Sequence, residues 1–532
     1  MGKKKIAVLL GQAEEAYQSS FMEGVMKRAF EAGYDVYAFS MYIKYQNTKE
    51  REVGDSNIYN LINYDLFDAV ILMSDIIQTP GVEERLEETI HNNFDGPVIC
   101  VDTDSKYYQS FWTDGYYAVY KTISHLIEHH GYKDIAFLTG RRNHVHSQRR
   151  LDAYRDAMKD HGITVNEDRV FYGDFWYTSG VGCAETLLRD RDNLPEVVAC
   201  ANDCMAIGLA EEMDRNGIRI PEDLAITGYG SSEEGQNSPK TLTSSFIPSE
   251  YYGTYAVDCV LKMLNDEEIA SPEYETELFI GESCGCEDNS SFITGNKREC
   301  WTTDTSDDGY YSIHNYMFED MLVSTNLEDL LEVIYNNIHH LKEVEAFSLC
   351  LNEEWLTPEK LYEKEPLSNG YTERMLNAIS FYNDGIHAGK ISMDEMFERN
   401  GLLPGYDDAK EPMGYYFTPV FFEDKAFGYA ILSYGSKPRA YDDIYRLWIN
   451  SVGRGLECMR RSYILQSLEN VKFKMETDKF SSIYDNEGGY NAARLSEDEL
   501  KELKEVENIL DNNLFVYHFQ PIVNAIDGEI SS

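Results

Sequence analysis

Short apolar runs alternate with amphipathic helical patterns over residues 4–285, and this alternation constrains the fold more than any other feature of the chain. The helical patterns of residues 21–32, 119–130 and 206–216 end at Gly33, Gly131 and Gly217, where C-terminal caps belong. Strands that alternate with helices form βαβ units and parallel sheets. We therefore predict an α/β fold, with strands at residues 6–10, 35–39, 69–73, 98–101, 135–139, 169–172, 197–201 and 224–228.

The main alternative for this pattern is an enzyme that binds a dinucleotide. Its first strand would lead into a glycine-rich turn that cradles a pyrophosphate at a helix N-terminus. Here Gly11 is the lone glycine of that turn, and Glu14 and Glu15 follow it. An acidic turn without GxGxxG argues against a dinucleotide, and we predict no cofactor.

The strongly negative net charge of the chain argues against nucleic acid as a binding partner. Of the 532 residues, 93 are Asp or Glu and 47 are Lys or Arg, which gives a formal net charge of −46. Such a chain repels a phosphate backbone, whereas nucleic-acid-binding proteins carry a basic footprint. Lys3, Lys4 and Lys5 are too few to form a DNA-binding domain. We predict no direct binding to nucleic acid.

Neither a secretory signal nor a membrane span is predicted, because no stretch approaches ~18 consecutive apolar residues. Ten scattered cysteines suit a reducing compartment, so we predict a cytoplasmic protein without membrane contact. Cys284 and Cys286 could form half of a metal site, but no second pair has ligand spacing, so we favour a reduced turn without metal. His144 and His146 are predicted to be exposed loop residues.

Three separated segments carry a family resemblance: residues 114–163, which begin DGYYAVYKTISHLIEHHGYKDIAFLTG, residues 195–230, PEVVACANDCMAIGLAEEMDRNGIRIPEDLAITGYG, and residues 242–264. In order and spacing they resemble the effector-binding core of the LacI/GalR family, which is type I periplasmic-binding-protein-like. The resemblance covers residues 4–285 and implies two α/β subdomains with parallel sheets, a small ligand in the cleft between them, and a homodimer. The family's helix-turn-helix would lie before Ile6, where there is no room for it, so we expect a sensor separated from DNA reading.

The remaining residues predict a second sensor and an output segment. A polar linker is predicted at residues 286–305, and residues 306–455 resemble a smaller α+β GAF domain. A helical or coiled-coil linker is predicted at residues 456–512. Within it, heptad spacing relates Ile464, Leu468, Val471 and Met475. Residues 513–532 resemble the start of an EAL domain, the fold of cyclic-di-GMP phosphodiesterases, and stop before its metal-binding glutamate. We predict that the chain as given is not an enzyme.

The LacI/GalR resemblance also implies which residues line the cleft. Arg150 matches the family's cleft arginine, whose planar fork can hold two hydroxyls; a surface arginine is the alternative. Asn202 follows a strand at the edge where ligands bind, and Asp203 is predicted to cap the next helix. For Asp114 an Asx turn is the alternative to a cleft wall.

Where the family continues GYD this chain has Gly230, which leaves the ligand's identity open. The predicted ligand-binding residues are Arg150, Asn202, Phe175, Trp176, Asp114, Gln12 and Tyr17.

Together these features predict a small-molecule sensor module that regulates an output domain. The ligand would be sugar-like or nucleoside-like, because polar groups that pair with hydroxyls and an aromatic face suit such rings. Cyclic-di-GMP signalling is the output that the C-terminal resemblance implies. The alternatives are a LacI-like transcriptional regulator without its own helix-turn-helix, and the regulatory portion of a cyclic-di-GMP phosphodiesterase.

Overall fold

The computed structural model describes residues 3–483, except for residues 44–47, 78, 80, 114, 143, 247, 273–276, 288–296, 302–315, 358–369, 384–388 and 405–410, and also residues 522–523 and 530–531. The chain divides into two compact units. The larger comprises Met1–Glu353 and Glu365–Glu457, and the smaller comprises Glu354–Lys364 and Cys458–Ser532. Most of the predicted linker and of the EAL-like segment lies outside the described residues.

The first subdomain of the larger unit is built on a parallel sheet with the strand order β2-β1-β3-β4-β5. Its strands are β1 (Lys4–Gly11), β2 (Tyr34–Met41), β3 (Ala69–Met73), β4 (Val98–Val101) and β5 (Gln109–Phe111). Its helices are α1 (Ala16–Glu31), α2 (Lys49–Ser56), α3 (Val82–Asn93) and α9 (Ser249–Leu264).

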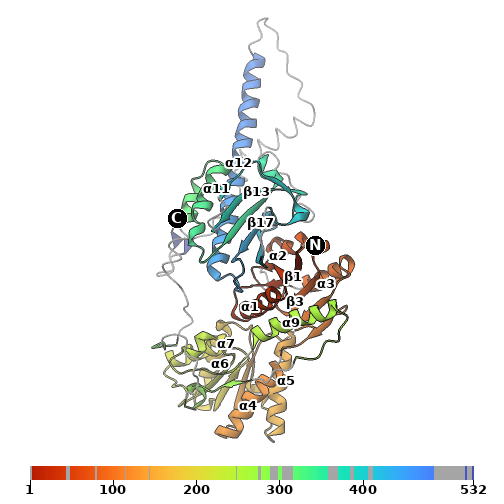
Figure 1. Cartoon of the computed structure of the whole chain (residues 1–532). Coiled ribbons are helices and arrows are strands. Elements are labelled where there is room, and N and C mark those ends of the chain that lie inside the picture. The colour runs from red at the N-terminus through yellow and green to blue at the C-terminus, as the bar shows by residue number, and fades with distance from the viewer. Residues whose placement is uncertain are drawn as a thin grey trace. The chain divides into compact units, whose positions relative to one another are not determined.

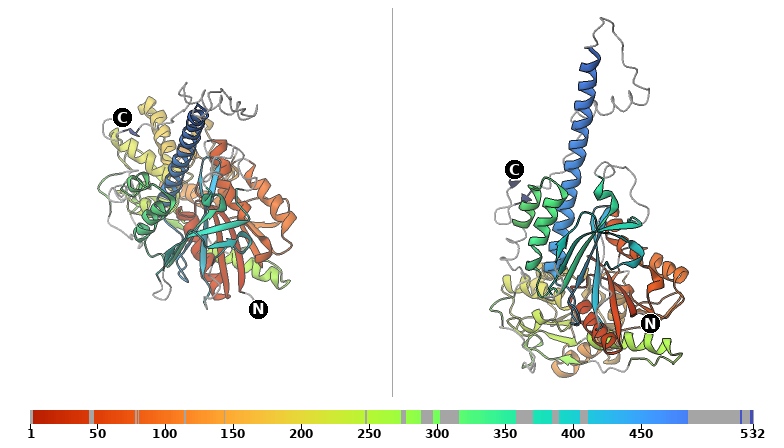
Figure 2. Two further views of the ribbon diagram at one scale, coloured as in Figure 1. Left: turned by 90° about the horizontal axis from the view of Figure 1, so that it is seen from above. Right: turned by 45° about the horizontal axis from the view of Figure 1, so that its top comes forward.

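Helices α1 and α9 pack side by side against this sheet (Figures 1 and 2). They approach closely because two of their residues are glycines. A Cβ at Gly24 would lie 2.0 Å from the carbonyl oxygen of Glu250, and one at Gly253 would lie 2.0 Å from that of Phe21. A larger residue at either position would push the two helices apart.

The second subdomain has a six-stranded sheet with the order β11-β10-β9-β8-β6-β7, which is parallel except at the edge strand β11. Its strands are β6 (Ile135–Thr139), β7 (Val170–Tyr172), β8 (Val197–Cys200), β9 (Ala225–Gly230), β10 (Thr243–Phe246) and β11 (Leu278–Phe279). Its helices are α4 (Gly115–His130), α5 (Val145–Asp160), α6 (Tyr177–Leu187), α7 (Asp203–Arg215), α8 (Glu233–Gln236) and the short 3-10 helix η6 (Glu282–Cys284). Gly33, Gly131 and Gly217 have φ values of 79°, 75° and 77°, which confirms the three predicted helix ends.

A third group of strands is antiparallel, in the order β14-β13-β12-β17-β16, and β15 also pairs with β13. The strands are β12 (Ala346–Asn352), β13 (Arg374–Tyr382), β14 (Lys390–Ile391), β15 (Met396–Glu398), β16 (Gly414–Phe422) and β17 (Lys425–Ser433). The helices are α11 (Leu327–Asn336) and α12 (Asp443–Ile483), and β18 (Ile522–Val523) pairs with β19 (Ile530–Ser531) near the end of the chain. These strands do not establish the predicted GAF-like assignment, which stays a prediction.

Strand β16 of the third group pairs in parallel with β2 of the first subdomain, so both belong to one eleven-stranded sheet (Figure 1). The register sets Tyr415 opposite Tyr37 and Phe417 opposite Phe39. The rings of Phe39 and Phe417 stack with centroids 4.8 Å apart, and the backbone N–H of Met413 donates to Asp35 at 2.9 Å. Aromatic side chains and backbone hydrogen bonds therefore join the predicted sensor core to the strands that follow it.

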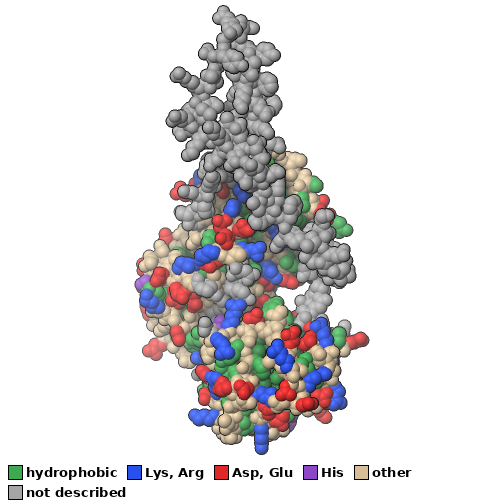
Figure 3. Space-filling view, turned by 180° about the vertical axis from the view of Figure 1, so that it is seen from behind, with side chains coloured by type: hydrophobic (Ala, Val, Ile, Leu, Met, Phe, Trp, Pro, Cys, Tyr) green, Lys and Arg blue, Asp and Glu red, His purple; other side chains and the backbone are tan. Residues whose placement is uncertain are grey.

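On the described part of the face shown in Figure 3, Lys and Arg side chains are interspersed with Asp and Glu and with hydrophobic side chains. None of the helices that the structure describes has the length and apolarity needed to cross a bilayer.

Candidate ligand cleft

Two side chains that follow strands of different subdomains, Asp102 after β4 and His146 after β6, lie near each other, and ligands of parallel α/β sheets bind at the carboxyl ends of the strands. Asp102, directly after β4, accepts a hydrogen bond from the Tyr17 hydroxyl at 2.9 Å and another from the backbone N–H of Thr113 at 2.6 Å. His146, in the first turn of α5, belongs to the other subdomain, and its Nε2 lies 4.0 Å from Asp102 Oδ1. One carboxylate therefore connects the two walls and the segment that crosses between them.

Arg150, one of the predicted ligand-binding residues, lies on α5. Its Nη1 donates to the carbonyl oxygen of Ala201, at the end of β8, at 2.7 Å. Its guanidinium lies 3.9 Å from the ring centroid of Tyr229 and 5.4 Å from that of Phe175, which are cation–π distances. Within the described residues its buried Nε has no hydrogen-bond partner. In Arg150, therefore, Nη1 is hydrogen-bonded, the guanidinium lies beside two aromatic rings, and Nε is left without a hydrogen bond among the described residues.

Phe175 lies against the end of β6, where Gly140 makes room for it. A Cβ at Gly140 would lie 2.2 Å from the Phe175 ring, and the Phe175 backbone adopts a positive φ of 69°. Asn202 holds this conformation, since its Nδ2 donates to the Phe175 carbonyl oxygen at 2.7 Å. Trp176 is different: its side chain is 49% exposed, and the structure does not bring it to Arg150.

The predicted role of Asp203 needs correction, whereas ligand binding by Asn202 stays a prediction. Asn202, and not Asp203, is the N-cap of α7, because its Oδ1 accepts the backbone N–H of Met205 at 3.0 Å. Asp203 is instead buried, where it accepts hydrogen bonds from the backbone N–H of Ser232 at 2.6 Å and from Ser244 Oγ at 2.7 Å. Burial raises the pKa of Asp203, and these hydrogen bonds oppose the rise. Asp203 therefore holds the segment after β9 in place.

Gly230 stands where the resembling family has an aspartate, and its backbone explains the difference. Its φ is 116°, a conformation that residues with a Cβ rarely adopt. An aspartate at this position would strain the end of β9. The backbone of this chain therefore favours glycine over aspartate at position 230.

The first subdomain contributes two predicted residues, Gln12 directly after β1 and Tyr17 in the first turn of α1. Gln12 has a φ of 50°, and its Nε2 donates to Glu15 at 3.1 Å, whereas Tyr17 is held by Asp102. The predicted residue Asp114 lies outside the described residues. Close by, the side-chain amide of Gln18 and the hydroxyl of Ser74, directly after β3, are buried and lack hydrogen-bond partners among the described residues.

Sequence reasoning missed His146, Asp102 and Tyr229. His146 is 5% exposed, so the prediction of an exposed loop histidine is wrong for this residue. Its ring contacts Trp112 edge-on at 5.7 Å. The helical spacing of His146 and Arg150 on α5, four residues apart, is a signal that could have found it, because such residues share a helix face.

A second set of polar contacts runs from the loop after β1 to helix α12. Glu14 Oε1 lies 2.5 Å from Arg446 Nε, and the Glu14 side chain is 6% exposed. Burial raises the pKa of Glu14 to about 7, although the nearby Arg446 guanidinium lowers it. The hydroxyls of Ser40 and Tyr441 are hydrogen-bonded at 2.9 Å. The loop that carries Gln12 is therefore packed against the start of α12.

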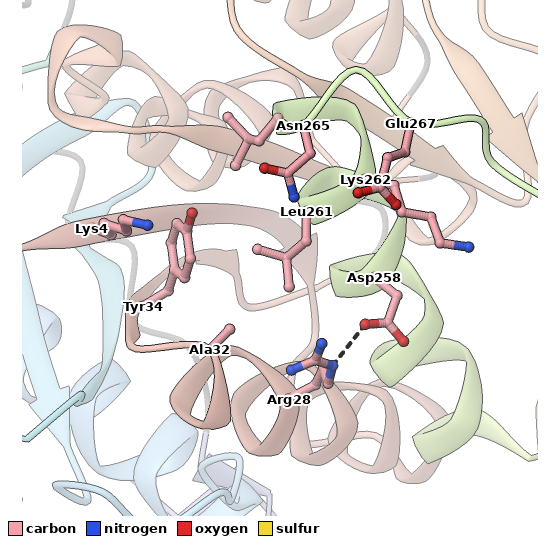
Figure 4. Close-up of a pocket in the computed structure, with 10 residues that line it drawn as sticks. Lys4, Arg28, Ala32, Tyr34, Asp258, Leu261, Lys262, Asn265 and Glu267 are labelled. Carbon is pink, nitrogen blue, oxygen red and sulfur yellow. Dashed lines mark hydrogen bonds and ion pairs between the residues drawn. The ribbon is translucent and has the colours of Figure 1, made fainter.

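The structure also has a hollow away from this cleft (Figure 4). It has a volume of about 400 Å³ and lies between α1, α9 and the amino ends of β1 and β2. Arg28 Nε and Asp258 Oδ1 form an ion pair across it at 2.7 Å. Ligands of parallel α/β sheets bind at the carboxyl ends of the strands, so this hollow is not the predicted site.

Comparison with known proteins places a family model described as a periplasmic binding protein-like domain on residues 123–284. The HTH-type transcriptional repressor PurR of Vibrio campbellii (strain ATCC BAA-1116) is 24% identical over 278 residues, which cover 52% of this chain and 78% of that protein. The PurR repressor of Pasteurella multocida (strain Pm70) is 25% identical over 284 residues, which cover 53% of this chain and 81% of that protein.

Among solved structures, the transcription regulator CcpA of Lactococcus lactis is similar, with 24% identity and a TM-score of 0.44 over 53% of this chain and 99% of that one. Both of these relatives are named as HTH-type transcriptional repressors. The first part of this chain has a periplasmic-binding-protein-like core similar to the effector-binding core of LacI/GalR regulators.

Proposed function

We propose that the chain is a ligand-responsive regulator whose core binds a small polar molecule in the cleft and passes the change in conformation to helix α12. The arrangement of Arg150 between Tyr229 and Phe175 supports this most directly. A planar cation with a free donor suits a hydroxyl or carboxylate, and an aromatic face suits the apolar side of a sugar or nucleobase. Gln18 and Ser74 add buried donors and acceptors that a polar ligand would satisfy.

The proposed regulator acts on transcription, as the names of its relatives suggest, and forms a homodimer. The relatives support this choice over cyclic-di-GMP signalling. Cyclic-di-GMP output depends on residues 513–532, of which the structure describes only β18 and β19. It stays a prediction, as does the absence of catalysis.

The proposed route to α12 begins in the loop after β1. This loop carries Gln12, which is predicted to face the cleft, and Glu14, which lies beside Arg446. A ligand that binds more tightly to one arrangement of the subdomains shifts the population toward it. Because β2 and β16 are hydrogen-bonded neighbours, a displacement of the first subdomain would be shared with the strands that support α12.

Thermal stability of the purified chain against a panel of sugars, nucleosides and amino acids tests the proposal. A ligand at ~100 times its dissociation constant adds ~2.7 kcal/mol to the free energy of unfolding. Arg150→Ala should abolish the shift. Arg155→Ala is the matched control, because Arg155 lies on the same helix and pairs with Glu167 at the surface at 2.7 Å. The absence of a shift with every compound, or equal loss in both variants, would contradict binding at Arg150.

A further inference from the structure

Two histidines and two cysteines converge at the end of the second subdomain, away from the ligand cleft. His125 and His130 lie on α4, Cys284 ends η6, and Cys286 follows two residues later. One side-chain nitrogen or sulfur from each residue lies within 4.8 Å of all the others. The sequence showed only the two cysteines as a pair, because the two histidines lie far earlier in the chain.

The distances in this cluster match those of a mononuclear tetrahedral site. Cys286 Sγ lies 3.3 Å from His130 Nε2 and 3.7 Å from His125 Nε2, and Cys284 Sγ lies 3.8 Å from His125 Nε2. With Zn–S bonds of ~2.3 Å and Zn–N bonds of ~2.0 Å, tetrahedral geometry separates sulfur from nitrogen by ~3.5 Å. The three measured separations bracket this value.

The surrounding structure holds the ligands in position. Thr243 Oγ1 lies 3.0 Å from Cys284 Sγ, where its proton can be donated to a thiolate. The Tyr132 hydroxyl donates to the Cys284 carbonyl oxygen at 3.1 Å, and the Tyr132 ring stacks on His130 with centroids 5.1 Å apart. These contacts fix the backbone of one ligand and the ring of another.

Gly285 lets the two cysteines converge. Its φ of 100° turns the chain between Cys284 and Cys286, and a residue with a Cβ would be strained there. Both cysteines are free thiols in the structure. A short turn that presents two soft sulfur ligands beside two imidazoles is the donor set that zinc prefers.

We propose that His125, His130, Cys284 and Cys286 bind one zinc ion. Four protein ligands leave no position open for water or substrate, so the ion is structural. It would fasten the segment at Cys286, where the chain leaves the core, to helix α4. The proposal is independent of any ligand in the cleft.

Metal analysis of the full chain tests this site. After dialysis against a chelator, the wild-type chain should take up one Zn²⁺ per chain and keep it through gel filtration. His130→Gln and Cys286→Ser should lower the bound zinc at least tenfold under the same conditions. His129→Gln and Cys300→Ser are matched controls, because both residues are exposed and lie outside the cluster, and both variants should bind like the wild type.

Cobalt provides a readout of the ligand set that does not depend on variants. Co²⁺ added to the metal-free wild-type chain should give intense tetrahedral d–d bands and a thiolate-to-cobalt charge-transfer band, which Zn²⁺ should then displace. A weak octahedral spectrum, zinc uptake equal in wild type and His130→Gln, or a mass that shows Cys284 joined to Cys286 would each overturn the proposal. Far-ultraviolet circular dichroism identifies any variant that fails to fold, in which case the wild-type cobalt spectrum decides.

Discussion

Replacing Glu14 by glutamine should remove a large part of the pH dependence of stability near neutrality. Burial raises the pKa of Glu14 from 4.5 to about 7 in the folded protein. The folded chain therefore holds this proton more tightly than the unfolded chain does. Protonated Glu14 therefore contributes ~3 kcal/mol to the free energy of unfolding at pH values below 4.5. This contribution is lost as the pH rises through 7, where Glu14 of the folded protein loses its proton.

Urea denaturation followed by tryptophan fluorescence at several pH values measures the effect. The free energy of unfolding of Glu14→Gln should rise relative to that of the wild type by up to ~3 kcal/mol between pH 4.5 and pH 8. Glu88→Gln, on the exposed face of α3, serves as the control for loss of a carboxyl group. A difference between Glu14→Gln and wild type that stays constant over this range would refute the argument.

The partner residue gives an independent check on the same ion pair. Arg446→Gln removes the cation that lies 2.5 Å from Glu14 and leaves a carboxylate buried without it. Removing one partner of a buried ion pair costs ~3–5 kcal/mol. Near pH 8, Arg446→Gln should therefore be less stable than both the wild type and Glu14→Gln. Glu14→Gln in the same chain should recover most of that loss.

Three further substitutions test the fold and the cleft. Phe417→Ala removes the ring stacked on Phe39 at the sheet junction and should lower the free energy of unfolding by ~3–5 kcal/mol in urea titrations. Gly230→Asp restores the family's residue at a φ of 116° and should lower the melting temperature, with a cost of ~1–3 kcal/mol. Asn202→Ala removes the N-cap of α7 and should cost ~1 kcal/mol, measured in the same way as for Phe417→Ala.

Most of the core fold could be predicted from local pattern. All eight predicted strands are present, and those at residues 69–73, 98–101 and 135–139 have the predicted bounds. Strands β5 and β10 were missed because QSF and TSSF are short and carry polar residues, so they become strands only through pairing with β4 and β9. The pairing of β16 with β2 could not be predicted, since no local signal specifies which distant edge a strand will join.

The family resemblance pointed to Arg150, Phe175 and Asn202, which lie close together in the structure, and their role in binding a ligand stays a prediction. Tyr229 was missed because its role depends on the Arg150 side chain crossing to β9, which follows from the tertiary fold. Sequence analysis identified Cys284 and Cys286 as half of a possible metal site and missed the two histidines for the same reason: His125 and His130 on α4 become neighbours of the distant CxC turn only after the second subdomain has folded.

The shared sheet bears on how a ligand signal could leave the core. Without β16, β2 would be an edge strand with unpaired backbone groups, which proteins normally protect. Because β16 satisfies those groups, separating the strands would cost several backbone hydrogen bonds and the stacking of Phe39 on Phe417. Thr418 of β16 is in turn hydrogen-bonded to Tyr445 of α12 at 2.7 Å. On the proposed function, motion of the first subdomain would therefore reach α12 at lower free-energy cost as a rigid displacement than by slippage at the junction between β2 and β16.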